Sequence, residues 1–273
     1  MRSPGPSAPA PRGIRGYRAG LVRRALRRVV RFTAGWASTL WRTALWAAGL
    51  PFQRTPERQA AWRVRCFQGW ARALCRIGAI ELEVVGPAPR GPCVLVTNHV
   101  GYADILALAA VLEAPAFVSM HEIRGLPLVG FMAHRMGTIF VDRRKKRAIP
   151  DVNAAIERAL DAGRIVVLFA EGANSDGSLV RPFRPSMLEP AARIGAACAW
   201  GALRYDVLPG DPPPSQAVCW HEQPIWVHAP RFLALERIRA RIEFGDGRVV
   251  ARERKQLAAQ LHARVTALFR PME

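Results

Sequence analysis

From residue 79 onward, short apolar segments alternate with helical patterns along the chain. Apolar stretches typical of strands occupy residues 80–84, 93–97, 116–119, 138–141, 165–169, about 197–203 and 239–244. Helical patterns occupy residues 104–112, 151–162, 186–194 and 251–269. Strands separated by helices favour one sheet with helices on its faces, so these residues are predicted to form a single α/β domain. No repeat and no Walker-type or G-x-G-x-x-G loop is present, so a nucleotide-binding fold has no motif support.

Length and cysteine content limit the kinds of fold and metal site that the chain can form. The chain has 273 residues, half of them hydrophobic, which is enough to bury the core of one enzyme-sized domain. Its five cysteines are odd in number and form no C-x-x-C pair, which argues against a zinc site and a disulfide framework. Residues 206–230 are rich in loop-forming residues and hold His221 and His228 without any metal-ligand spacing, so irregular surface structure and no bound metal are expected there.

The N-terminal part of the chain is strongly basic. Arginines crowd the sequence before the first acidic residue, Glu57, within a formal net charge of +19. Residues 1–30 are predicted to be a disordered basic N-terminus, and residues 31–78 a pair of amphipathic helices that lie at a membrane interface, the first of them ending at Pro51. Arg42 lies near the middle of the first apolar run, 32–52, which disfavours a membrane span.

The positive charge attracts nucleic acid, anionic lipid or phosphate-bearing substrates. No nucleic-acid-binding module accompanies it, so we expect an anionic membrane surface as the partner and no nucleic acid. At 100° per residue, Arg31, Gly35, Ser38 and Arg42 fall on one stripe, with Trp36 and other apolar residues away from it. This pattern suits a helix in the lipid headgroup layer, although a pair of surface helices packed on the core would also produce it.

One stretch carries a convincing acid/base pair. Residues 98–104 join an apolar strand to a helical pattern, with His99 on the turn and Asp104 in the first helical turn. A carboxylate on one imidazole nitrogen fixes the tautomer and leaves the other nitrogen free to accept a proton from an alcohol. His99 is therefore the candidate general base and Asp104 its orienting partner. An Asp that only caps the helix beside an incidental histidine is the alternative.

Three blocks taken together resemble the lysophospholipid acyltransferase family, which contains 1-acylglycerol-3-phosphate acyltransferases and lyso-ornithine lipid acyltransferases. The resemblance covers roughly residues 79–210 and depends on the order and spacing of the blocks. They are Asn98-His99-x4-Asp104, Gly137-Thr138-Ile139-Phe140-Val141-Asp142-Arg143 and Phe169-Ala170-Glu171-Gly172-Ala173-Asn174-Ser175-Asp176-Gly177.

The resemblance implies a glycerolipid acyltransferase-like sheet flanked by helices and a membrane-associated enzyme on the cytoplasmic face of the inner membrane. It implies transfer of a fatty acyl group from acyl-carrier protein or coenzyme A to the hydroxyl of a lysolipid, with no bound cofactor. Asn98, Arg143, Glu171 and Gly172 would bind the acceptor. Backbone N–H groups near His99 would stabilise the oxyanion.

The sequence departs from the family pattern where phosphate-binding cations are common. Met120 replaces a lysine, and Ala170, Ala173 and Asn174 replace the proline, threonine and arginine of the third block. Three readings stay open: compensation by Arg124, Arg181 or Arg184; an acceptor without glycerol phosphate, such as lyso-ornithine lipid; and a catalytically impaired homologue that only binds lipid at the membrane surface.

Overall fold

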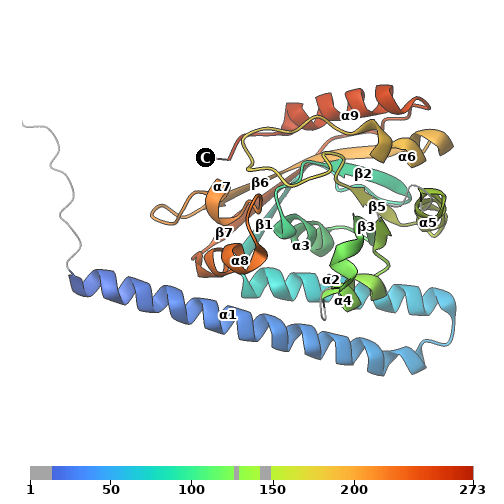
Figure 1. Cartoon of the computed structure of the whole chain (residues 1–273). Coiled ribbons are helices and arrows are strands. Elements are labelled where there is room, and N and C mark those ends of the chain that lie inside the picture. The colour runs from blue at the N-terminus through green and yellow to red at the C-terminus, as the bar shows by residue number, and fades with distance from the viewer. Residues whose placement is uncertain (1–13, 126–128, 142–148, 273) are drawn as a thin grey trace, which may run out of the picture.

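The computed structural model describes residues 14–125, 129–141 and 149–272. A single twisted sheet forms the middle of the molecule, with helices on both faces (Figure 1). On one face α3 lies against the sheet, and the antiparallel pair α1 and α2 lies beyond it. Helices α6 and α9 cover the other face. The predicted α/β architecture is confirmed.

The sheet contains the seven predicted strands, in the order β1-β7-β6-β2-β5-β3-β4. Strands β6, β2, β5, β3 and β4 run parallel to one another, while β7 runs antiparallel to β6 and parallel to β1. The strands are β1 (Ile80–Val85), β2 (Cys93–Thr97), β3 (Pro115–Met120), β4 (Ile139–Val141), β5 (Ile165–Leu168), β6 (Cys198–Val207) and β7 (Ile238–Phe244).

Strand β2 occupies the centre of the sheet, and all of its residues are buried. It pairs with β5 through Val96↔Leu168 and with β6 through Thr97↔Gly201. Because β6, β2 and β5 are parallel, their carboxyl ends lie at the same edge of the sheet. In open α/β sheets such edges commonly carry ligand sites.

Four helices of the α/β part, α3, α5, α6 and α9, agree closely with the patterns in the sequence, whereas α4, α7 and α8 have no predicted counterpart. Helix α3 packs its small buried residues Ala103, Ala107 and Ala110 against the domain core, and α9 buries Leu257 and Leu261 on the other face. The helices are α3 (Tyr102–Val111), α4 (Val129–Arg135), α5 (Ile149–Asp161), α6 (Glu189–Ile194), α7 (Pro214–Ala217), α8 (Ile225–Ala234) and α9 (Arg254–Leu268), with 3-10 turns at Leu50–Phe52, His121–Gly125 and Pro185–Met187.

Helix α8 corrects the expectation of irregular structure over residues 206–230. Pro224 precedes the helix and Pro230 lies inside it, so the sequence pattern suggests loop. A proline inside a helix removes one backbone hydrogen bond, here the bond to the Trp226 carbonyl. Helix α8 also places His228 in the protein interior rather than on an irregular surface, since its side chain is buried.

The N-terminal helical pair consists of α1 (Ile14–Gly49) and α2 (Pro56–Ile77). The prediction of a disordered segment over residues 1–30 is wrong from Ile14 onward, because these residues continue α1. Alanine, leucine and arginine are among the best helix formers, so the arginine-rich sequence supports a helix. Helix α1 ends at Gly49, directly before a 3-10 turn that contains Pro51, close to the predicted end.

The basic stripe of α1 faces the protein instead of the lipid headgroups that we expected. Arg27 Nη1 donates to the Ala234 carbonyl at 2.8 Å. Arg31 donates to the carbonyls of Leu235 and Glu236. These carbonyls lie at and just after the C-terminus of α8, where unpaired carbonyl oxygens favour cations. Burial is the main reason that the pKa of Arg31 lies below its usual value.

The opposite side of α1 is apolar and exposed. Trp41 is 63% exposed and Leu40 is 58% exposed. No helix in the described residues is long and apolar enough to cross a membrane. The exposed large apolar residues of α1 are Leu21, Val22, Leu26, Val29, Val30, Phe32, Trp36, Leu40, Trp41 and Leu45.

The contacts of Arg31 give a test of how α1 is held on the domain. We expect Arg31→Ala to lower the free energy of unfolding by about 1–3 kcal/mol, because it leaves buried carbonyls without a charged donor. Arg28→Ala removes an exposed arginine from the same helix and serves as the control. Urea denaturation in mild detergent measures both variants, and equal midpoints would contradict the docking role of Arg31.

Candidate active site

His99 follows the carboxyl end of β2 and lies on the turn that leads into α3. Its Nδ1 is 2.7 Å from Asp104 Oδ2, and its ring stacks on Phe169 with a centroid distance of 3.8 Å. The Asp104 carboxylate at one edge and the Phe169 ring stacked against one face therefore fix the imidazole ring. No residue in the described parts of the chain bonds Nε2, and 16% of the side chain stays exposed.

The Asp104 carboxylate is fully buried and accepts hydrogen bonds at both oxygens. Oδ2 accepts from the backbone N–H groups of Val100 at 2.7 Å and Gly101 at 3.1 Å, in addition to the His99 ring. Oδ1 accepts from the Tyr205 hydroxyl at 2.7 Å. Asp104 thus caps the start of α3 and holds the His99 ring at the same time, so it does more than cap the helix, and its role in catalysis stays a prediction.

Backbone contacts fix the rest of the turn. The His99 N–H donates to Glu171 Oε1 at 2.7 Å, and the His99 carbonyl accepts from the Ser175 N–H at 2.9 Å. The Val100 carbonyl accepts from the Trp220 N–H at 2.7 Å. The expectation that N–H groups near His99 stabilise an oxyanion is wrong for residues 99–101, because these donors already bond Glu171 and Asp104.

Glu171 comes after the carboxyl end of β5, next to the His99 turn. Its second oxygen, Oε2, accepts from the Arg181 N–H at 2.9 Å. Burial raises the pKa of Glu171 to about 7, although these two backbone donors and His99 lower it. Its carboxyl group orders the site by joining the His99 turn to the Arg181 segment.

Gly172 adopts a positive φ of 78°, which favours glycine. A Cβ at this position would lie 2.8 Å from Arg184 Nε. Arg184 and Arg181 therefore flank the Glu171–Gly172 turn, where the family arginine is replaced by Asn174. The Asn174 side chain instead donates to the Trp220 carbonyl at 2.7 Å and holds two loops together.

The structure does not test acceptor binding by two of the predicted residues, Asn98 and Arg143. Asn98 is buried, its amide donates to the Leu203 carbonyl at 3.0 Å, and its oxygen accepts from the Leu203 N–H at 2.7 Å. The structure gives Asn98 the role of tying the turn to β6, and contact with an acceptor stays a prediction. Arg143 lies outside the described residues. The side chain of Met120 is also outside the described part of the chain.

Sequence reasoning missed two groups that hold the site. Tyr205 on β6 and Trp220 after α7 contact the His99–Asp104 turn, as does Ser175 of the third block. The neighbours of Tyr205 and Trp220 give no local chemical signal. Only the parallel arrangement of β6, β2 and β5 could have indicated that the ends of these strands meet.

The arrangement suits proton transfer at His99 Nε2. Nδ1 is held by the carboxylate, so the exposed Nε2 is the position that can accept a proton from a hydroxyl group. No group of three His, Cys, Asp or Glu side chains suited to a metal occurs in the described ranges.

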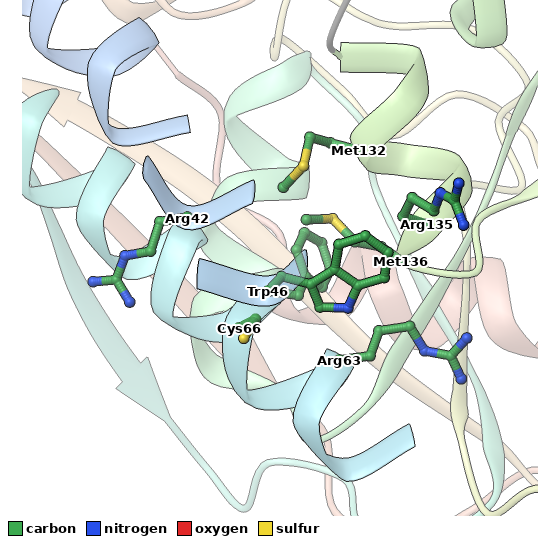
Figure 2. Close-up of a pocket in the computed structure, with 8 residues that line it drawn as sticks. Arg42, Trp46, Arg63, Cys66, Met132, Arg135 and Met136 are labelled. Atoms are coloured by element: carbon green, nitrogen blue, oxygen red, sulfur yellow. The ribbon is translucent and has the colours of Figure 1, made fainter. Parts of the chain in front are cut away.

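An apolar pocket lies between α1, α2 and α4, apart from the His99 turn (Figure 2). The cavity is small, with a volume of about 10 Å³. Trp46 lies at its centre, Met132 enters from α4, and Met136 directly follows the end of that helix. Arg42 and Arg63 point away from it on opposite sides, and the Arg135 guanidinium lies over the Trp46 ring, 5.5 Å from the ring centroid, so the three charges do not gather around a common point.

The part of the chain that holds the histidine–carboxylate pair is similar to a known protein family. Residues 80–201 match the family model described as Acyltransferase. This range begins at β1 and includes His99, Asp104 and Glu171. Residues 80–201 are therefore similar to the acyltransferase domain, which confirms the resemblance predicted from the three blocks.

Named acyltransferases are similar to the same part of the chain. The chain is 34% identical over 151 residues to a lyso-ornithine lipid O-acyltransferase of Pseudomonas aeruginosa, covering 55% of this chain and 56% of that protein. It is 36% identical over 128 residues to a 1-acyl-sn-glycerol-3-phosphate acyltransferase of Neisseria gonorrhoeae, covering 46% of this chain and 50% of that protein. The matched region thus spans about half the length of these relatives.

A solved structure shares the whole fold. The crystal structure of the 1-acyl-sn-glycerophosphate acyltransferase PlsC from Thermotoga maritima superposes with a TM-score of 0.68. The match covers 91% of this chain and 97% of that chain at 16% identity. At this identity the match confirms the fold alone.

The buried carboxyl of Glu171 gives a pH-dependent test. Its pKa is raised to about 7 in the folded protein, so the stability that its neutral form contributes is complete below about 4.5 and is lost as the pH rises to about 7. We expect the unfolding free energy of the wild type relative to Glu171→Gln to fall over this range, by at most about 1.4 kcal/mol per pH unit. Urea denaturation at pH 5 and pH 7 measures this difference.

The control for this test is Glu113→Gln, which changes an exposed carboxyl group. Its difference from the wild type is expected to stay constant between the two pH values. A constant difference for Glu171→Gln as well would show that burial does not govern the protonation of Glu171.

Proposed function

We propose that this protein is a membrane-surface O-acyltransferase that moves a fatty acyl group from a thioester donor, acyl-carrier protein or coenzyme A, to the free hydroxyl of a lysolipid. The observation that carries the proposal is the 2.7 Å contact between His99 Nδ1 and Asp104 Oδ2 within residues 80–201, which are similar to the acyltransferase domain. The acceptor is lyso-ornithine lipid or 1-acylglycerol-3-phosphate, which are the substrates in the names of the relatives.

In this mechanism His99 Nε2 takes the proton of the acceptor hydroxyl while its oxygen attacks the thioester carbonyl carbon. The imidazolium that forms is stabilised by the ionised Asp104 carboxylate. The tetrahedral intermediate then collapses, the carbon–sulfur bond breaks, and the leaving thiolate takes the proton from Nε2. The ester product forms without a covalent enzyme intermediate.

Arg181 and Arg184 are the candidates for contact with the acceptor headgroup in the described structure. Both flank the Glu171–Gly172 turn, and Arg184 is exposed. A guanidinium can bond a carboxylate or a phosphate with two parallel hydrogen bonds. They therefore suit the carboxylate of an amino-acid lipid as well as a lysolipid phosphate, and Arg143 is the further predicted ligand.

Membrane association would bring the enzyme to both acyl-chain substrates. The exposed apolar side of α1 contains Phe32, Trp36 and Trp41, which suit insertion at the headgroup boundary. Exposed arginines on α1 and α2, such as Arg28 and Arg65, would attract anionic lipid. We place this surface on the cytoplasmic face of the inner membrane, where both proposed donors are available.

Removal of His99 tests the reaction. We expect His99→Ala to lower acyl transfer about 10²–10⁴-fold, because a positioned general base contributes this much. His134→Ala changes an exposed histidine and serves as the control. Membranes with each variant are offered labelled acyl-carrier protein with lyso-ornithine lipid, lysophosphatidate or an equal mixture of both, and product from one acceptor only identifies the substrate.

Near-normal acyl transfer by folded His99→Ala protein would contradict the mechanism. No product from the wild type with either acceptor, together with retained binding to lipid vesicles, would favour the alternative of a catalytically impaired homologue that binds lipid. That alternative draws on Met120, Ala170, Ala173 and Asn174, where the family usually carries other residues.

Membrane binding has its own test. We expect Leu40→Glu to weaken binding to vesicles of phosphatidylglycerol and phosphatidylcholine about tenfold or more, because a charge replaces an apolar group that enters the interface. Val250→Glu is the matched control, since Val250 is 59% exposed, close to the 58% of Leu40, but lies outside the helical pair. Co-sedimentation measures binding, and equal losses for both variants would argue against α1 as the binding face.

A further inference from the structure

A tyrosine hydroxyl bonds the carboxylate that holds the candidate base. Tyr205 Oη donates to Asp104 Oδ1 at 2.7 Å, and both side chains are fully buried. Tyr205 lies on β6, and Asn98 bonds the backbone of Leu203 on the same strand. The hydroxyl is therefore held by a strand that pairs directly with β2, which leads to His99.

We propose that Tyr205 is a positioning residue for acyl transfer, whose hydroxyl shares the negative charge of Asp104 and so sets how strongly the carboxylate attracts the ring proton of His99. The consequence for catalysis rests on the proposed function, whereas the effect on His99 protonation does not. Tyr205 contacts neither nitrogen of the His99 ring in the described structure, so it acts only through Asp104.

The chemistry follows from the two oxygens of Asp104. Oδ2 bonds the His99 ring and two backbone N–H groups, while Oδ1 bonds Tyr205. Hydrogen bonds to a charged acceptor are strong and withdraw charge from it. Without the phenol, more negative charge would face the ring, and the imidazolium would become easier to form. The base would then be protonated over more of the pH range in which it must be neutral.

The Tyr205 hydroxyl keeps its proton, and so stays a hydrogen-bond donor, throughout the pH range in which His99 must be neutral. Burial and the neighbouring Asp104 carboxylate raise the pKa of Tyr205 well above its usual value. The other titratable groups that face this pair, besides His99, are Cys75 from α2, Cys219 after α7 and Glu171 after β5. Burial raises the pKa of Cys75 to about 11 and that of Cys219 further, so both thiols stay neutral.

Glu171 is the neighbour whose titration could be mistaken for that of His99, because burial raises the pKa of Glu171 to about 7. The test therefore uses nuclear magnetic resonance of ¹⁵N-histidine in the full chain in detergent, with His99 assigned by its absence in His99→Ala. Each comparison is repeated with Glu171→Gln, which removes the competing titration.

We expect Tyr205→Phe to raise the pH midpoint of His99 protonation by about half a unit or more, since a hydrogen bond to a charged group is lost. We expect 3-fluorotyrosine at position 205, a more acidic phenol that keeps the fold, to lower the midpoint. The acidic limb of the acyl-transfer profile moves in the same directions. Tyr102→Phe, which removes a partly buried phenol hydroxyl bonded to His228 rather than Asp104, is expected to leave the midpoint unchanged.

An unchanged midpoint with fluorotyrosine, or equal shifts for Tyr205→Phe and Tyr102→Phe, would overturn the proposal and leave Tyr205 as a packing residue. Fluorotyrosine gives this answer even where Tyr205→Phe does not fold. A shifted midpoint in a protein that transfers no acyl group would support the role of Tyr205 and reject the proposed function.

Discussion

The buried carboxylate of Asp104 is the group on which the site depends. A charge that is fully removed from water is costly unless hydrogen bonds satisfy it. Its donors come from the turn after β2, from the His99 ring and from Tyr205 on β6. The carboxylate is satisfied only where α3, β2 and β6 are in their native positions. The hydrogen bonds that satisfy the buried Asp104 carboxylate therefore require this edge of the sheet to be folded, and the same bonds orient the candidate base.

Local patterns in the sequence predict most of the fold and the centre of the site. Apolar runs indicate the strands, and the spacing of His99 and Asp104 on a strand–turn–helix predicts their contact. Such features involve residues within a few positions of one another, so a single sequence contains them. Tyr205, by contrast, is separated from Asp104 by 101 positions. A tyrosine in a buried strand is ordinarily a core residue, and only the pairing of β6 with β2 gives it a polar partner.

Helix α1 shows a different limit of sequence reasoning. The periodicity of its residues correctly separates a basic stripe from an apolar side. It does not show which of these two sides packs against the protein. The unpaired carbonyls at the end of α8 decide this, because they supply acceptors for Arg27 and Arg31. The guanidinium groups of these two residues thus satisfy protein carbonyls, and the apolar side is left exposed. A basic helix can therefore present lipid with its apolar residues while its arginines hold it to the domain.

Helix α8 connects that surface to the site. Its C-terminal end accepts hydrogen bonds from α1, and its buried His228 Nδ1 is hydrogen bonded to the hydroxyl of Tyr102 at 3.0 Å. Tyr102 is the first residue of α3, two positions before Asp104. Burial lowers the pKa of His228 to about 4, so this contact joins two neutral groups at physiological pH. Helix α8 thus contacts both α1 and the start of α3, and it links the helix that carries the exposed apolar side to the helix that carries Asp104.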